Sequence, residues 1–236
     1  MQEKFTEIIP FHTQGEPMIK SAFMACGARY LCLTTQDFDK GIASRLYEEA
    51  SQHILESVQN PDRNSAMCAA AAVALNVYEV MCPTLMNRMN HTAGARALIK
   101  ECGWDSRTPG VGRACFWTSI ITELLHCLHF NWTISWHPDT WGVDMNMDDA
   151  SSKIVGDEEL WIYRIIYICA KISNFRSSPP QLQRDHQDNN IYLSSRCKEW
   201  DELTDLCDRW QEAIPRSMSP LSYISFSSQS ALPQVW

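Results

Sequence analysis

Glu123, His126 and His129 have the spacing most suggestive of metal chemistry, because they follow one another at intervals of three residues. On a helix, a Glu and a His three apart can ligate a di-iron centre when facing helices supply a second such pair. No second Glu-x-x-His occurs in the chain. We therefore expect these residues, with Ser119 and Thr122, to form a solvated or partly buried polar edge of their helix.

Asp148 and Asp149 form an acidic pair of the kind that binds metal in helical isoprenoid-type enzymes. Such sites need further carboxylates at helical spacing, and residues 150–152 are Ala and Ser, so we expect a surface loop. The 10 cysteines contain no C-x-x-C pair, which disfavours a zinc site. A Gly-x-Ser-x-Gly nucleophile motif is also absent. The sequence thus predicts no catalytic, cofactor-binding or metal-binding residue, and a protein that is not an enzyme.

Three of the nine tryptophans, Trp132, Trp136 and Trp141, lie in a long connection between predicted helices. Aromatic residues at helical spacing are most often part of the core, but these three lie outside a helix. We expect them to pack the connection back over the helices.

Apolar residues at helical spacing predict seven helices and no convincing strand, which makes the fold class all-α. Asp37 or Asp39 can cap the second helix, and Gly103 can end the fourth. We expect an irregular multi-helix bundle with a lead-in over 1–16, one domain over 17–236, and long loops at about 131–157, 176–194 and 215–231. The predicted helices cover about 17–34, 42–58, 66–81, 86–101, 112–130, 157–175 and 195–214.

The helices differ in how far their surfaces are apolar. Residues 66–81 are apolar almost all round, which predicts a central helix with neighbours on several sides. The helix at 157–175 carries Arg164 and Lys171 on one edge. In the last helix, an inward-facing stripe is expected from Trp200, Leu203, Cys207, Trp210 and Ile214.

The composition excludes several classes of protein. The 236 residues carry 20 Lys+Arg against 28 Asp+Glu, a net charge of −8, which disfavours DNA binding by this chain alone. The charge is −1 over residues 1–118 and −7 over 119–236. No signal peptide is visible, and the longest apolar run, residues 66–77, is too short to span a bilayer. Cysteines within apolar stretches indicate reduced thiols and an intracellular protein.

An ordered set of short segments resembles the regulatory region of fungal-specific transcription factors, the middle homology region of zinc-cluster regulators. The resemblance spans about 17–236, and it depends on the shared order of motifs that are weak singly. These segments are Ala25-Cys-Gly-Ala-Arg-Tyr-Leu, Leu46-Tyr-Glu-Glu-Ala, Val77-Tyr78-Glu79, His91-Thr-Ala-Gly-Ala-Arg-Ala-Leu-Ile with Gly103, Ala114-Cys-Phe-Trp-Thr, Leu128, Trp141, Ile166-Tyr-Ile-Cys-Ala-Lys-Ile-Ser-Asn-Phe, Trp200-x-x-Leu, Arg209-Trp210 and Leu232-Pro-Gln-Val-Trp.

The resemblance implies an all-α regulatory domain in the nucleus that controls a linked DNA-binding protein, with no catalytic residues and no cofactor. It also implies a protein partner or self-association through helices, and it leaves room for a small-molecule effector. Family members carry an N-terminal zinc cluster of six cysteines and a basic segment, which this sequence lacks. Their regulatory domain also continues past the Pro-x-x-Trp segment. We therefore expect a partial domain, from a gene fragment or a shortened paralogue.

Three functions remain open from the sequence. The first is the non-catalytic regulatory and interaction domain of a fungal transcription factor, without its own DNA-binding module. The second is an all-helical metal-dependent enzyme that uses Glu123, His126 and His129, or Asp148 and Asp149. The third is a stand-alone helical scaffold for protein interaction. No membrane association is expected from any of them.

Overall fold

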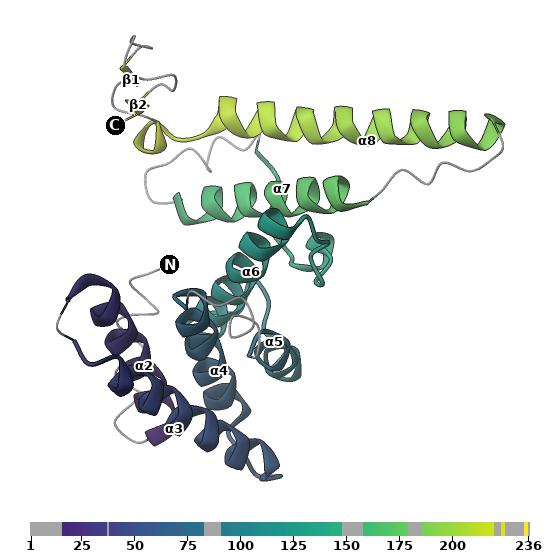
Figure 1. Ribbon diagram of the computed structural model, residues 1–236. Coiled ribbons are helices and arrows are strands. Elements are labelled where there is room, and N and C mark those ends of the chain that lie inside the picture. Colours follow the sequence, from purple (N-terminus) through teal and green to yellow (C-terminus); the bar gives the residue numbers. More distant parts are fainter. Residues whose placement is uncertain are drawn as a thin grey trace. The chain divides into compact units, whose positions relative to one another are not determined.

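Seven α-helices make up most of the chain in the part that the computed structural model describes (Figure 1). The described residues are 16–36, 38–82, 91–147, 158–178, 186–219, 223–224 and 234–235. The only β-structure within them is an antiparallel pairing of β1 (Tyr223–Ile224) with β2 (Gln234–Val235). The predicted all-α class is therefore confirmed.

The chain divides into two units, residues 1–142 and 143–236, and each is described separately below. The first unit contains α2 (Pro17–Thr34), α3 (Lys40–Gln59), α4 (Ser65–Val80), α5 (Thr92–Glu101), α6 (Val111–Phe130) and the 3-10 turn η2 (Pro138–Thr140). The second contains α7 (Glu158–Ser177), α8 (His186–Ala213), the 3-10 turn η4 (Arg216–Met218), β1 and β2.

Helix α4 lies at the centre of the first unit, where α2, α3, α5 and α6 all pack against it. Its alanines from Ala69 to Ala72 are buried, and their small side chains let neighbouring backbones come close. On its partner α2, the buried face also consists mainly of small residues such as Ala22, Ala25 and Ala28. The predicted central position of this apolar helix is confirmed.

Local signals in the sequence set several helix ends. Pro17 occupies the first turn of α2, and the Asp39 carboxylate accepts a hydrogen bond of 2.8 Å from the Gly41 N–H at the start of α3. Gly103 has a φ of 66°, and the Trp104 N–H donates to the Ile99 carbonyl, which closes the end of α5. Asp37, the other predicted cap, lies outside the described residues.

The second unit is built on the antiparallel contact of α7 with α8. Its core contains Met147, Trp161 and Ile168, against which Leu206 and Trp210 of α8 pack. The Trp210 Nε1–H donates to the Trp161 carbonyl at 3.0 Å.

Two predictions about helices were wrong. Helix α7 extends to Ser177 and α8 begins at His186, so the predicted loop 176–194 contains eleven helical residues. The first residues of α8, His186 to Asn190, are all polar, so hydrophobic periodicity does not indicate the helix there. Trp200 is 59% exposed instead of facing inward, since it lies at the edge of the face that contacts α7.

Arg164, which the sequence placed with Lys171 on one edge of the helix, is fully buried. Its Nε donates to the Asp144 carbonyl at 2.8 Å and its Nη2 donates to the Asn146 carbonyl at 2.7 Å. The guanidinium also lies 4.4 Å from the centre of the Trp161 ring. Arg164 thus links the segment at residues 144–146 to α7 by hydrogen bonds. For the predicted helix 86–101, only α5 is described, since 86–90 lie outside the described residues, as do 1–15 of the predicted lead-in.

Candidate functional site

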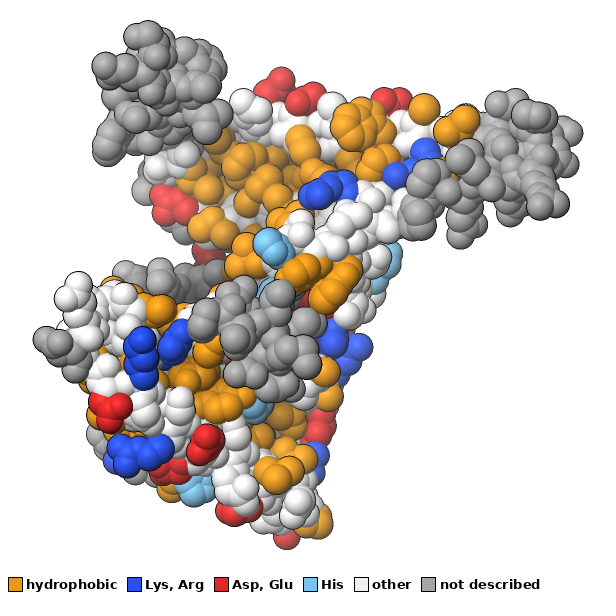
Figure 2. Space-filling model, in the orientation of Figure 1, with side chains coloured by type: hydrophobic (Ala, Val, Ile, Leu, Met, Phe, Trp, Pro, Cys, Tyr) orange, Lys and Arg blue, Asp and Glu red, His pale blue; other side chains and the backbone are white. Residues whose placement is uncertain are grey.

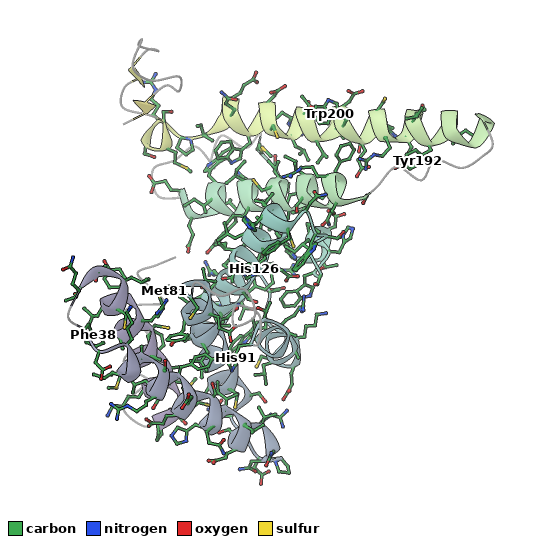
Figure 3. All side chains as sticks on the ribbon, in the orientation of Figure 1. Phe38, Met81, His91, His126, Tyr192 and Trp200 are labelled. Atoms are coloured by element: carbon green, nitrogen blue, oxygen red, sulfur yellow. The ribbon has the colours of Figure 1, made fainter. Side chains whose placement is uncertain are left out.

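The polar stripe of α6 faces inward, which corrects the prediction of a water-facing or partly buried edge. Ser119, Thr122, Glu123 and His126 are buried, whereas the neighbouring Leu125 is 55% exposed. The reason is that α5 and the segment after α6 cover this side of the helix and bring polar partners with them. Figure 3 labels His126 on α6.

The three residues predicted as alternative metal ligands do not come together as a ligand set. Arg96 Nη1 lies 2.9 Å from Glu123 Oε1, and the Ser135 N–H donates to the same oxygen at 2.7 Å. His126 is buried beside Glu123 in the stripe, but His129 is exposed. Within the described ranges, no group of three or more His, Cys, Asp or Glu could hold a metal ion. Asp148 and Asp149 lie outside those ranges.

The loop tryptophans pack back on the helices, as predicted. Trp141 is fully buried, and its ring centre lies 6.0 Å from that of Trp117 and 6.4 Å from that of Phe116, both on α6. Trp136 is half-buried, with its ring centre 5.3 Å from that of Phe116. Trp132 is 47% exposed and lies against Phe130. The connection between α6 and residue 142 is therefore part of the core of the first unit.

A polar cluster that the sequence analysis did not predict lies between α3, α4 and the start of α5. The Glu79 side chain is only 1% exposed, and its Oε1 lies 2.6 Å from Nδ1 of His91. The Tyr47 hydroxyl donates to the same oxygen at 2.8 Å, and the backbone N–H of His91 donates to Oε2 at 3.3 Å. Both carboxylate oxygens are thus engaged by groups of the chain itself.

Aromatic contacts complete this cluster. The rings of Tyr47 and Tyr78 stack with centres 4.7 Å apart, and the rings of His91 and Tyr47 meet edge to face with centres 5.5 Å apart. Two residues after Glu79, just past the end of α4, the Met81 carbonyl accepts hydrogen bonds from Nε and Nη2 of Arg29 on α2. In metal and catalytic sites, a carboxylate often holds a histidine in one orientation. Here the second oxygen of the Glu79 carboxylate accepts the His91 backbone N–H, so the carboxylate also fixes the beginning of α5.

The sequence did contain a signal for this cluster. Helix α4 is apolar almost throughout, and Glu79 is its only charged residue. A single carboxylate on a helix that is buried on all sides must be paired, since burying an unpaired charge is costly. The partners could not be predicted, because Tyr47 and His91 lie 32 and 12 residues away from it.

All ten cysteines are described, and each is free. Burial raises the pKa of the Cys26 and Cys115 thiols to about 12 and that of Cys127 to about 11, which keeps these thiols protonated. Cys197 on α8 is the one cysteine classed as exposed. The buried thiols therefore act as small apolar side chains, as the sequence predicted for most of them.

Exposed apolar side chains gather on two helices. On α2 they are Met24, Tyr30, Leu31 and Leu33, with exposed fractions between 41% and 60%. On α8 they are Ile191, Leu193 and Trp200, with exposed fractions between 50% and 66%. No helix in the described ranges is long and apolar enough to cross a membrane. Apolar side chains that form a contiguous exposed patch, unlike singly scattered ones, mark a surface for binding.

Comparison with known proteins identified no relative. No protein-family model, no curated protein and no solved structure matches this chain.

Proposed function

We propose that this chain is the regulatory and interaction domain of a fungal-specific transcription factor, which acts by binding protein and not by catalysis. The observation that carries the proposal is the contrast between its buried carboxylates and its exposed apolar side chains. The carboxylates with the burial expected of a reactive centre, Glu79 and Glu123, are engaged by residues of the chain itself. Several large apolar side chains of α2 and α8, such as Leu33 and Trp200, by contrast lie at the surface.

Four segments that carry the family resemblance supply the contacts around the end of α4, which supports the proposal. Arg29, Tyr47, Glu79 and His91 come from four different segments of that ordered set. Their order in the sequence then has a physical reason, because each segment contributes one partner to the same junction of helices. An all-α fold is also what the resemblance implies.

The proposed role includes a nuclear location and no DNA-binding activity of the chain's own. The net charge of −8 opposes phosphate binding, so the DNA-reading module would be a separate, basic and cysteine-rich part. A small-molecule effector is compatible with this role. In a mobility-shift assay, the purified chain should give no sequence-specific, salt-sensitive complex with DNA.

A tethering experiment tests the regulatory role. The chain is fused between a heterologous DNA-binding domain and an activation domain, and reporter expression is measured in a fungal strain. Expression should change relative to the same fusion without the chain. The Leu193→Ser and Leu125→Ser variants, at two exposed leucines on different helices, show whether any effect depends on α8. Unchanged expression with a stably accumulated fusion protein would contradict the proposal and favour a scaffold without a role in transcription.

Metal analysis tests the enzymatic alternative. Protein purified without chelators is assayed for iron, zinc and magnesium, alongside His126→Ala and His129→Ala variants. We expect no stoichiometric metal, because Arg96 and Ser135 already occupy the Glu123 oxygen. Stoichiometric metal that is lost in His126→Ala would overturn the proposal in favour of a metal-dependent enzyme.

A further inference from the structure

The exposed surface of α8 contains a continuous apolar strip. Leu193, Cys197 and Trp200 follow one another at intervals of four and three residues, so they lie along one side of the helix. Leu193 is 50% exposed, Trp200 is 59% exposed, and Cys197 is exposed between them. We call these three residues the α8 strip.

The strip is distinct from the face of α8 that packs on α7. That face carries Leu203, Leu206 and Trp210. Towards the N-terminus of α8, the contact with α7 includes a hydrogen bond of 2.9 Å from Arg196 Nη2 to the Phe175 carbonyl. Since Phe175 lies two residues before the end of α7, the part of α8 before Arg196 extends beyond that helix (Figure 1). Trp200 lies at the boundary of the two faces, with its ring centre 6.0 Å from that of Phe175.

Acidic residues of α8 lie next to the strip and continue along the solvent side of the helix beyond Trp200. Helix α8 has seven Asp and Glu against three Lys and Arg, a net charge of −4. Among the described residues, exposed Asp201, Asp208 and Glu212 have no ion-pair partner, whereas the three basic residues of α8 each lie within 3.8 Å of a carboxylate on the same helix. Figure 2 shows acidic side chains along the outer edge of α8, beside hydrophobic side chains of the second unit.

We propose that the α8 strip binds a basic amphipathic helix of another protein. Apolar side chains of such a helix would cover Leu193 and Trp200, and its Lys or Arg residues would meet the unpaired carboxylates. The indole of Trp200 adds a site for a cation over its face. This inference rests on the proposed function and names the chemical class of the partner.

Charge is the reason to prefer this occupant over a second copy of the chain. A second α8 placed on the strip would bring its own carboxylates towards Asp201, Asp208 and Glu212. Contact between like charges is unfavourable. A basic partner removes that repulsion and gives the three carboxylates their missing counter-charges. The apolar contact is available to either occupant, so the charge decides between them.

Binding is tested on the full chain with a synthetic peptide. The probe is an amphipathic helix of about 20 residues, with Leu on one face, Lys on the other and no Cys. The matched peptide has Glu in place of every Lys. Fluorescence anisotropy of the labelled peptides should show saturable binding of the Lys peptide, weakened by added salt, and no binding of the Glu peptide.

Cys197 reports where the peptide binds, since it lies in the middle of the strip. Alkylation by iodoacetamide is followed by mass spectrometry with and without the Lys peptide. Bound peptide should suppress alkylation of Cys197 and leave the rate at half-buried Cys32 of α2 unchanged. If the Lys peptide binds without protecting Cys197, the strip is not its site and the proposal fails.

Variants test both halves of the contact. Trp200→Ser and Leu193→Ser should each weaken binding by about tenfold, as expected for a central apolar contact. Leu125→Ser removes an exposed leucine of α6 and should leave binding unchanged. The double variant Asp201→Asn, Asp208→Asn should reduce both affinity and its salt dependence, whereas Asp62→Asn in the first unit should not.

Two further outcomes would overturn the proposal. Equal binding of the Lys and Glu peptides would show that charge does not select the partner. Protection of Cys197 that rises with protein concentration in the absence of peptide would identify a second copy as the occupant. The tethering result does not depend on this peptide, so a reporter response without peptide binding would reject the partner class and leave the regulatory role intact.

Discussion

The Glu79 carboxylate lies 2.6 Å from Nδ1 of His91 in a site where Glu79 is almost completely removed from water. The same oxygen accepts the Tyr47 hydroxyl, so one carboxylate joins α3, α4 and the start of α5. The three elements are consecutive helices, and this cluster links them through side chains 12 to 44 residues apart. We conclude that Glu79 is a structural centre of the first unit.

Replacing Glu79 should therefore be costly. Glu79→Ala is expected to reduce the free energy of unfolding by about 3 kcal/mol, because it leaves the polar groups of Tyr47 and His91 buried without their acceptor. Glu79→Gln keeps one acceptor oxygen and should cost less. Urea unfolding followed by circular dichroism measures both. An Ala variant as stable as the parent chain would show that the cluster is not structurally important.

The inward-facing stripe of α6 gives a second prediction. Glu123→Ala should reduce the free energy of unfolding by about 2–3 kcal/mol, since it leaves the half-buried Arg96 and the Ser135 N–H without an acceptor. His129→Ala, three residues beyond His126 and exposed, should change it by less than about 0.5 kcal/mol. Thermal unfolding of the two variants provides the comparison, and equal effects would mean that the stripe is solvated after all.

The sequence predicted the helices best where their burial is complete. The apolar run of α4 indicates a central helix on its own, and the cap signals at Asp39 and Gly103 mark real helix ends. Periodicity distinguishes an apolar face from a polar one, but it does not say what covers the polar face. The full burial of Glu123, on an edge predicted to be solvated or partly buried, was not predicted for that reason, because the covering partners Arg96 and Ser135 belong to other elements.

The same limit explains why the burial of Arg164 was not predicted and why the prediction for Trp200 was wrong. A buried arginine has no signature in the sequence of its own helix when its acceptors are the backbone carbonyls of Asp144 and Asn146. Trp200 continues the apolar spacing of α8, yet it lies where that face meets solvent. Trp200, which matters most for the proposed binding, is thus the residue of the exposed strip that hydrophobic patterning assigns to the core.

Two glycines, one in α5 and one just after it, test where this helix ends. Gly103 has a φ of 66°, a conformation that an L side chain adopts at a cost, so Gly103→Ala should destabilise the protein by about 1 kcal/mol. Gly94 is helical and exposed, with open space around a new Cβ atom, so Gly94→Ala should stabilise it by about 0.5–1 kcal/mol. Opposite signs in urea unfolding are expected, and two changes of the same sign would refute the assigned helix end.

The buried thiols predict how stability depends on alkaline pH. Burial raises the pKa of Cys115 to about 12 from 9.0, so above pH 9 the unfolded chain loses this proton while the folded chain keeps it. The free energy of unfolding should then fall as the pH rises from 9 towards 12, by up to about 1.4 kcal/mol per pH unit for each such thiol. Below pH 9 both states keep the proton, and this contribution should not vary.

The Cys115→Ala variant isolates this effect. Urea unfolding of the variant and the parent chain is compared in the presence of a reductant at pH 7.5, 8.5, 9.5 and 10.5. Two of these values lie below the ordinary thiol pKa of 9.0, and two lie between it and the raised pKa of Cys115. The variant should lose less stability than the parent between the two highest values, and the same amount between the two lowest. Any loss from the missing sulfur itself shifts all four values equally, so it does not affect the slope. Parallel curves over the whole range would show that the Cys115 thiol is ionised as easily in the folded chain as in the unfolded one.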